Sequence, residues 1–376
     1  MRPDEIAQAV LAREDVARYL EREEGGGADP EARRRVEAYL DELRTTQRYR
    51  FYRALQHPLY PIFRKIQRIT EGIDHAIAAN RDGHVVYVSN HKSHLDYLVE
   101  GLVLDDHGVR PPLMIAGINL FEGPFGLIHR HVTGAIPIRR NSKDPLYLVT
   151  LRGYVAEVLK RRDIFYYSEG GRSYSGELKA PKTGVLQAAL LADRRHTSVL
   201  PMAVAYDLVL EAGIISREAS RRRSRAFSQE LAEMVRHAVG FQTRAFVTFG
   251  APIPLSDYDP ESRRDLVSLA HRIQHEIGRL YKVLPTALVA AAMQPQITRH
   301  ELAARIDAML VTLADAGANL GVQSGQDAVD DGVDRLVERG VLVAARTRLR
   351  VRNRIVLRFY ARTLAHLLAP HRRAIH

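Results

Sequence analysis

Between residues 76 and 290, short runs of β-branched and aromatic residues alternate with helical patterns, and this alternation restricts the fold more than any other feature. Helix caps support the pattern, because Asp144 is a favourable N-cap residue and Pro145 suits the first helical position. Alternating strands and helices predict an α/β domain with a central mixed sheet flanked by helices. The predicted strands are His84–Ser89, Leu113–Ala116, Ala135–Ile138, Ile164–Ser168, Val199–Ala205 and Ala245–Phe249. Ligands of such domains bind beyond the carboxyl ends of the strands.

The regions on either side are predicted to be helical, with an N-terminal region over 1–75, the α/β domain over 76–290 and a mostly helical region over 291–376. The pattern of Arg34–Leu43 predicts a helix. The segment Phe51–Ile66 mixes aromatic, apolar and basic residues, so it predicts either a membrane-surface element or a helix packed on the next domain. Near the end, two helical patterns precede a short strand pair, which favours a small winged-helix-like unit.

Composition limits the chemistry. The 376 residues include no cysteine, which excludes disulfides, cysteine-ligated metals and a cysteine nucleophile. The net charge of +11 favours anionic partners, which are nucleic acid, acidic lipid headgroups or phosphorylated substrates. We find no signal peptide and no apolar run of about 18 residues, so a membrane-spanning helix is not expected.

The segment Asn90–Asp96 directly follows a predicted strand and contains His91 and Asp96 five residues apart. On a continuous helix these side chains would point away from each other, so they meet only if the chain turns between them. A carboxylate on one imidazole nitrogen fixes the tautomer and stabilises the imidazolium, which makes the other nitrogen a base. His94 also suggests metal ligation, but no second cluster of ligands accompanies it, so the sequence predicts no metal and a structural His94.

Two further clusters carry groups that bind phosphate. Arg139 and Arg140 follow the strand Ala135–Ile138, where guanidinium groups could grip a phosphate, although a solvated strand end has the same pattern. The second cluster follows the strand Ile164–Ser168, and its glycines allow close backbone approach to an anion. It consists of Ser168, Glu169, Gly170, Gly171, Arg172 and Ser173, with Lys182 a few residues later.

Together with the strand around Pro201, these clusters resemble the glycerophosphate acyltransferase superfamily. The shared motifs are His-x4-Asp, Ile-Pro-Ile-Arg-Arg, Ser-Glu-Gly-Gly-Arg-Ser and Val-Leu-Pro, in that order. The resemblance is strongest to the branch of bacterial glycerol-3-phosphate 1-O-acyltransferases and dihydroxyacetone-phosphate acyltransferases. It departs from the usual pattern at Lys92, where arginine is common, and at Tyr174, which replaces a second arginine.

The resemblance implies an enzyme that moves a fatty acyl group from acyl-CoA or acyl-carrier protein to the sn-1 hydroxyl of glycerol 3-phosphate. It implies His91 as general base and Asp96 as the residue that orients it, with no cofactor. We expect the net charge of +11 to serve contact with anionic lipid, so the predicted location is peripheral, at an anionic membrane surface on the cytoplasmic face of the cell membrane. The substrate-binding residues implied are Arg139, Glu169, Gly170, Gly171, Arg172, Ser173, Lys182 and Pro201.

Two other interpretations fit parts of the sequence. The same chemistry could act on dihydroxyacetone phosphate or lysophosphatidate. A basic nucleic-acid-binding protein would explain the net charge and the arginine-rich stretch Arg217–Arg225, which is also typical of a solvated loop. That interpretation leaves the His91–Asp96 pair unexplained, so no nucleic acid is expected as a partner.

Overall fold

The computed structural model describes residues 3–22, 30–51, 54, 66–121, 126, 130–209 and 243–368. Most of the segment Phe51–Ile66, and all of Arg217–Arg225, lie outside the described residues. Within the described ranges, every helix is too short or too polar to span a lipid bilayer.

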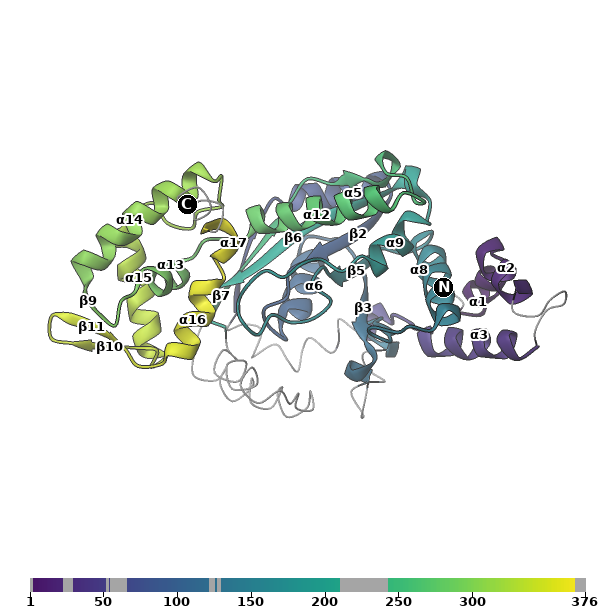
Figure 1. The fold of residues 1–376 in the computed structure, drawn as a ribbon, viewed down its shortest axis with the longest axis horizontal. Coiled ribbons are helices and arrows are strands. Elements are labelled where there is room, and N and C mark those ends of the chain that lie inside the picture. Colours follow the sequence, from purple (N-terminus) through teal and green to yellow (C-terminus); the bar gives the residue numbers. More distant parts are fainter. Residues whose placement is uncertain are drawn as a thin grey trace.

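An eight-stranded mixed sheet forms the centre of the molecule, with strand order β1-β7-β6-β2-β5-β3-β4 and β8 paired to β6 (Figure 1). Its strands are β1 (Ile66–Glu71), β2 (His84–Ser89), β3 (Leu113–Gly117), β4 (Ile136–Ile138), β5 (Ile164–Tyr167), β6 (Thr197–Tyr206), β7 (Thr243–Phe249) and β8 (Ile253–Pro254). All six strands expected from the sequence are present, so the predicted α/β class with a mixed sheet is confirmed. The β1 strand also joins this sheet, in parallel with β7, although it precedes residue 76.

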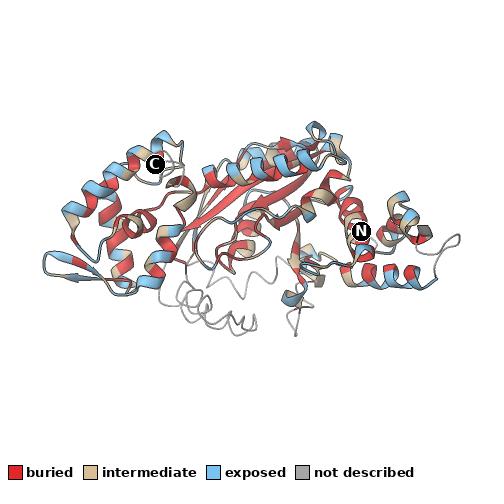
Figure 2. Ribbon diagram, in the orientation of Figure 1, coloured by how far each residue is buried: buried red, intermediate tan, exposed pale blue. Residues whose placement is uncertain are grey.

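The strands β6, β2, β5, β3 and β4 run parallel to one another. Their carboxyl ends therefore meet at one edge of the sheet, and the segments that follow β2, β4 and β5 converge there. Figure 2 shows that the central strands are largely buried, whereas the covering helices expose one face. This matches the apolar runs of the sequence, because parallel strands are covered on both faces.

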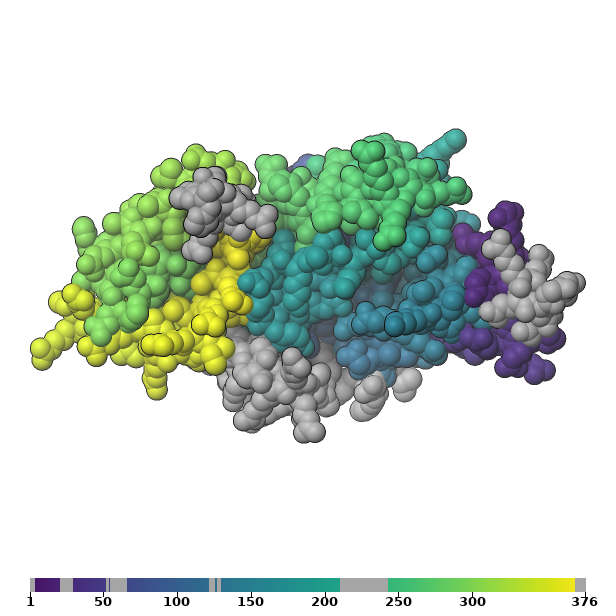
Figure 3. Space-filling view, in the orientation of Figure 1, coloured from purple at the N-terminus to yellow at the C-terminus, as the bar shows by residue number. Residues whose placement is uncertain are grey.

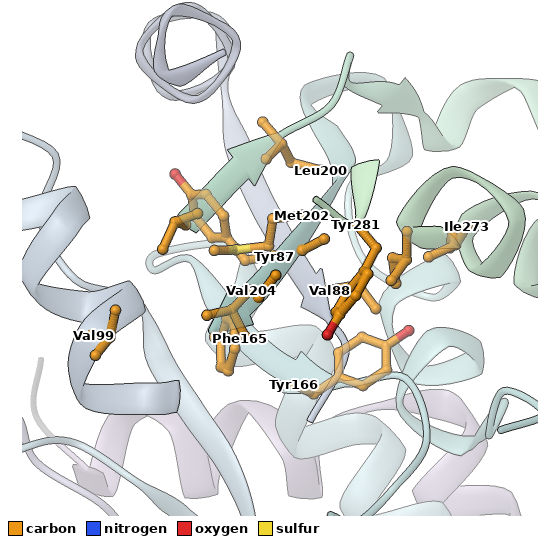
Figure 4. Close-up of a cluster of buried hydrophobic side chains, with 14 of the residues drawn as sticks. Tyr87, Val88, Val99, Phe165, Tyr166, Leu200, Met202, Val204, Ile273 and Tyr281 are labelled. Carbon is orange, nitrogen blue, oxygen red and sulfur yellow. The ribbon is translucent and has the colours of Figure 1, made fainter. Parts of the chain in front are cut away.

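Helices cover the sheet, and further helices lie beyond it at both ends of the molecule (Figure 1). Figure 4 shows Val99 of α6 and Ile273 of α12 on opposite sides of the strands that carry Tyr87, Met202 and Val204. The α-helices are α1 (Pro3–Leu11), α2 (Glu14–Arg22), α3 (Pro30–Leu43), α5 (Ile73–Asp82), α6 (Asp96–Asp106), α8 (Pro145–Leu159), α9 (Gly184–Leu190), α12 (Arg263–Leu280), α13 (Pro285–Ala292), α14 (Arg299–Asp315), α15 (Gly325–Glu338), α16 (Arg354–Arg362) and α17 (Ala365–Leu368). The short 3-10 helices are η1 (Ile118–Phe121), η2 (Arg194–His196) and η3 (Leu255–Asp257).

The helix α8 begins as the sequence predicts. The side chain of Asp144 accepts hydrogen bonds from the backbone N–H groups of Leu146 and Tyr147, at 3.0 and 3.3 Å, and Pro145 occupies the first helical position. On its outer side, α8 packs against α1, α2 and α3. The N-terminal helices thereby form one end of the molecule, drawn in purple in Figure 3.

The C-terminal region forms the other end. Helices α13–α16 pack together, and a three-stranded antiparallel sheet of order β10-β11-β9 borders them. The strands are β9 (Gln296–Thr298), β10 (Leu342–Ala345) and β11 (Arg348–Val351). The predicted order of two helices followed by a strand pair is confirmed by α14, α15, β10 and β11.

A buried carboxylate joins this C-terminal region to the sheet. Asp207, at the end of β6, is fully buried, and its Oδ2 lies 2.7 Å from Arg244 Nε and 3.0 Å from Arg335 Nη1. Arg244 belongs to β7 and Arg335 to α15, so one carboxylate links the two regions. Asp331 of α15 pairs with the same two guanidinium groups.

We predict that Asp207→Ala lowers the free energy of unfolding by about 3 kcal/mol. Removing one partner from a buried ion pair leaves the other charge uncompensated, at a cost of about 3–5 kcal/mol. The lower end applies because the Arg244 and Arg335 side chains keep 27% and 24% of their exposure. Urea unfolding followed by circular dichroism measures the change.

The control is Asp334→Ala, because Asp334 forms an exposed ion pair with Arg299 at 2.7 Å. Exposed pairs contribute about 0–1 kcal/mol, so this variant should unfold close to the wild type. Equal destabilisation by the two substitutions would contradict the linking role of Asp207.

Candidate active site

The loop between β2 and α6 is organised by a single carboxylate oxygen. Asp96 is the first residue of α6, and its Oδ2 accepts hydrogen bonds from Lys92 N at 2.6 Å and Ser93 N at 2.9 Å. The same oxygen lies 2.9 Å from Nδ1 of His91. The chain therefore turns between His91 and Asp96 and brings the two side chains together, as the sequence predicts.

The His91 imidazole is largely enclosed, with 13% of its side chain exposed, while Asp96 is fully buried. Burial lowers the pKa of His91, and the nearby charges of His94 and Arg172 lower it further, whereas the hydrogen bond and charge of Asp96 oppose the shift. Because Asp96 accepts from Nδ1, the neutral ring carries its proton on Nδ1. Nε2 is left as the basic nitrogen.

The side chain of Asn90 anchors the start of this loop to the neighbouring strand. Its amide donates to Val204 O and its carbonyl accepts from Val204 N, both at 2.9 Å. Asn90 thus extends the pairing of β2 with β6 by side-chain hydrogen bonds. The imidazole of His91 is consequently held just beyond the sheet edge.

The loop that follows β5 lies directly beside His91. The backbone N–H of Ser168 donates to Ser89 O at 2.9 Å, and that of Ser173 donates to His91 O at 2.8 Å. Between them, Gly170 adopts a φ of 68°, a conformation that favours glycine. Arg172 precedes Ser173 in this loop, and its positive charge contributes to lowering the pKa of His91.

The side chains of Glu169 and Lys92 are buried where the loop after β5 meets the loop after β2. Glu169 accepts hydrogen bonds from the backbone N–H groups of His91 and Lys179, at 3.4 and 3.2 Å, and its carboxylate lies 3.9 Å from Lys92 Nζ. Lys92 Nζ also donates to the carbonyl oxygens of Gly176 and Glu177, both at 2.9 Å. Burial lowers the pKa of Lys92. Lys92 therefore holds the loop in place and is directed away from solvent, at 2% exposure.

Lys182 completes this corner of the site. Its backbone N–H donates to Ser168 O at 2.7 Å, and its side chain passes so close to Gly170 that a methyl group there would lie 3.0 Å from Lys182 Cγ. Ser173 is fully buried and donates its hydroxyl to Glu177 O at 2.7 Å. Pro201 is buried in β6, and its carbonyl accepts from Gly250 N at 2.8 Å.

The two arginines that follow β4 point to different neighbours. The Arg139 guanidinium pairs with Glu42 of α3, with Nη2 2.6 Å from Oε2, and lies 5.0 and 5.2 Å from the ring centroids of Tyr39 and Tyr147. Arg139 is thereby tied to the N-terminal helices.

Arg140 instead reaches toward the loop after β5. A methyl group on Gly117 would lie 2.5 Å from Arg140 Nε, and one on Gly171 would lie 3.8 Å from Arg140 Nη1. The side chain thus crosses the end of β3, where only glycine leaves room, and ends beside Gly171. Of the two arginines, Arg140 is the one that approaches the loop after β5 that contains Gly170 and Gly171.

Three site residues escaped the sequence-based prediction. The ring of Tyr167 stacks on the His91 ring at a centroid distance of 3.9 Å and an angle of 6°. The Tyr167 hydroxyl donates to Glu100 Oε2 at 3.1 Å, and Ser89 donates to Glu100 Oε1 at 2.5 Å. For Glu100, the available signal was an acidic residue one helical turn after Asp96, placed between apolar residues of the same helix.

Comparisons with known proteins agree with the motifs. Residues 68–205 match a family model described as Acyltransferase, and residues 231–371 match one described as Glycerol-3-phosphate acyltransferase C-terminal region. Three curated proteins named glycerol-3-phosphate acyltransferase are similar to this chain. They come from Aeromonas hydrophila, with 34% identity over 238 residues, Actinobacillus succinogenes, with 37% over 240, and Pasteurella multocida, with 36% over 243.

These alignments cover 60%, 60% and 61% of this chain. They cover 29%, 29% and 30% of the respective relatives, so the matched part spans less than a third of each curated protein.

We predict that His91 titrates below its ordinary pKa of about 6.5, because burial and Arg172 disfavour the imidazolium. Asp96→Asn should lower this pKa further, since the carboxylate favours the imidazolium. Arg172→Gln should raise it, since a repulsive charge is lost. NMR titration of the imidazole, assigned by its absence in His91→Gln, measures all three. If the pKa of His91 is the same in both variants as in the wild type, the proposed electrostatic coupling is wrong.

Proposed function

We propose that the chain transfers a fatty acyl group to glycerol 3-phosphate, because residues 68–205 match the Acyltransferase model and residues 231–371 match the model of the glycerol-3-phosphate acyltransferase C-terminal region. The hydroxyl acylated would be that of sn-1, and the donor acyl-CoA or acyl-carrier protein. The observation that carries the proposal is the contact of 2.9 Å between His91 Nδ1 and Asp96 Oδ2, at the strand edge where Arg172 also lies.

In the proposed mechanism His91 acts as a general base. Its Nε2 removes the proton from the glycerol hydroxyl as the hydroxyl oxygen attacks the thioester carbonyl carbon. Asp96 stabilises the resulting imidazolium through Nδ1. The tetrahedral oxyanion then collapses, the carbon–sulfur bond breaks, and the imidazolium returns its proton to the leaving thiolate. The acceptor brings its own nucleophile, so no acyl-enzyme forms, and the lowered pKa of His91 keeps the base neutral near pH 7.

The phosphate of the acceptor would bind at the loop that follows β5. Arg172 and Lys182 come from this loop and the segment after it, and Arg140 approaches Gly171 from β4. Guanidinium groups bind phosphate through bidentate hydrogen bonds, which would fix the orientation of the glycerol. Glu169, with Gly170 and Gly171, would support the loop and line the same pocket, while Ser173 and Pro201 would shape its walls.

A small, mostly apolar pocket of about 40 Å³, partly open to solvent, is the place where the proposal puts the start of the acyl side. It reaches Glu100, which contacts Tyr167 beneath the imidazole. Its lining includes Tyr97, Gly101, Leu104, Pro112, Met114 and Phe165. With the net charge of +11, we propose that the enzyme works at an anionic membrane surface on the cytoplasmic face, where it can deliver its product.

We predict that His91→Ala lowers kcat by about 10²- to 10⁴-fold, the usual contribution of a positioned general base. The assay incubates the full-length protein with glycerol 3-phosphate and palmitoyl-CoA or palmitoyl-acyl-carrier protein, and determines the position acylated. Dihydroxyacetone phosphate, lysophosphatidate and generic duplex DNA serve as alternative ligands. Transfer only to an alternative acceptor, or DNA binding without transfer, would overturn the proposed substrate or function.

The matched control is His196→Ala. His196 also pairs with an aspartate, since its Nδ1 lies 2.9 Å from Asp193 Oδ2, but it is 68% exposed and precedes β6 at the opposite edge of the sheet. This variant should keep wild-type kcat. Turnover by His91→Ala equal to that of the control would refute the base assignment.

We further predict that Arg140→Gln raises the KM for glycerol 3-phosphate on the order of tenfold or more, because a charged hydrogen bond is worth about 1.5–3 kcal/mol. Arg139→Gln should raise it less, since Arg139 already pairs with Glu42. Initial rates at varied glycerol 3-phosphate separate the two. A larger effect of Arg139→Gln would show instead that the phosphate displaces Glu42, in agreement with the sequence-based assignment of Arg139.

A further inference from the structure

Three buried polar residues, Ser89, Glu100 and Tyr167, form a column of contacts that ends at the His91 imidazole. Ser89 ends β2, Glu100 lies in the second turn of α6, and Tyr167 ends β5. Both hydroxyl oxygens lie within hydrogen-bond distance of the Glu100 carboxyl group, at 2.5 Å from Oε1 and 3.1 Å from Oε2. The Tyr167 ring then lies parallel to the His91 ring at 3.9 Å. Three elements of the fold therefore meet at one carboxyl group, and Tyr167 connects this group to the His91 ring.

A carboxyl group at this position is costly. Glu100 is 1% exposed and Ser89 is fully buried, and a buried carboxylate without a compensating cation is strongly disfavoured. Asp96 lies four residues earlier on the same face of α6, so a second negative charge would be close to the first. An apolar side chain would fill the same space without either penalty. Stability alone therefore does not explain a glutamate here.

The surroundings keep this acid neutral. Burial raises the pKa of Glu100 well above its ordinary value, and the negative charge of Asp96 raises it further. A raised pKa favours the protonated carboxyl group, which adds no charge beside the His91–Asp96 pair. Burial likewise raises the pKa of the Tyr167 hydroxyl, which remains protonated. When Glu100 is protonated, one of its oxygens accepts a hydrogen bond from one hydroxyl and the other donates its proton to the second hydroxyl, so the hydrogen bonds join neutral groups.

We propose that Glu100 and Tyr167 are positioning residues for the base, with Glu100 anchoring the Tyr167 ring flat against the imidazole of His91. Asp96 fixes one edge of the imidazole, and the tyrosine ring fixes its plane. Together they keep Nε2 directed at the bound hydroxyl, which matters because small misplacements of reacting groups cost large factors in rate. This inference rests on the proposed function, since it assigns these residues a task in the same acyl transfer.

The test compares kcat and the KM for glycerol 3-phosphate in four variants of the full-length protein. Glu100→Leu removes both anchoring hydrogen bonds, and we expect kcat to fall about 10- to 100-fold with KM changed less than about threefold. Glu100→Gln is neutral and can bond to both hydroxyls, so it should retain kcat within about threefold. Tyr167→Phe keeps the ring and loses the anchor, so its kcat should lie between these values.

Tyr166→Phe is the matched control. Tyr166 precedes Tyr167 in β5, so its side chain points to the opposite face of the sheet, into the core shown in Figure 4. Its kcat should equal that of the wild type. The mild Tyr167→Phe change keeps the comparison possible even where Glu100→Leu fails to fold.

A second readout is independent of turnover. The stacked Tyr167 ring should shift the ring-proton NMR resonances of His91 upfield, and this shift should persist in Glu100→Gln and shrink in Glu100→Leu. A folded Glu100→Leu variant with unchanged kcat and unchanged His91 shifts would overturn the proposal. So would a Glu100→Gln variant as impaired as Glu100→Leu, because that result would require a charged glutamate.

Failure of the proposed function gives a different pattern. If the wild type transfers no acyl group to glycerol 3-phosphate while the NMR shifts respond as expected, the column still positions His91 and only the assigned reaction is wrong. If the wild type is active and Tyr167→Phe matches Tyr166→Phe in both readouts, the function stands and the positioning role is refuted.

Discussion

The hydrogen bonds of one carboxylate oxygen determine the arrangement of the whole site. Asp96 Oδ2 accepts from Lys92 N, Ser93 N and His91 Nδ1, so the turn, the start of α6 and the orientation of the imidazole are fixed together. The start of a helix is a favourable place for such a charge, because the helix dipole stabilises an anion there. The contact with His91 Nδ1 also leaves Nε2 as the basic nitrogen of the imidazole.

Around this contact, the parallel part of the sheet supplies the remaining groups. Strands β2, β5, β3 and β4 end at one edge, so residues far apart in the sequence become neighbours without long loops. The buried Lys92–Glu169 pair locks the loop after β5 onto the loop after β2, and Asn90 locks the latter onto β6. These hydrogen bonds and the ion pair hold in place the loop that carries Arg172 and that the Arg140 side chain approaches.

Charged residues are among the groups that link each end of the molecule to this edge of the sheet. At the N-terminal end, Glu42 and Tyr39 of α3 hold Arg139, the residue before Arg140. At the C-terminal end, Asp207 joins β6 and β7 to α15. The helical regions thus stabilise the strands and loops that carry the site. Arg139 points toward α3 and pairs with Glu42, whereas the next residue, Arg140, points toward Gly171.

The sequence by itself determined the α/β class, the six main strands, the cap at Asp144 and the turn that pairs His91 with Asp96, because apolar periodicity and helix caps are local properties. Tertiary structure alone decided which of two adjacent arginines approaches Gly171 and which pairs with Glu42, since successive side chains diverge and Glu42 lies 97 residues away from Arg139. It also decided that Glu100 and Tyr167 meet beneath the imidazole, 67 residues apart, in a contact that only the packing of α6 against the sheet creates.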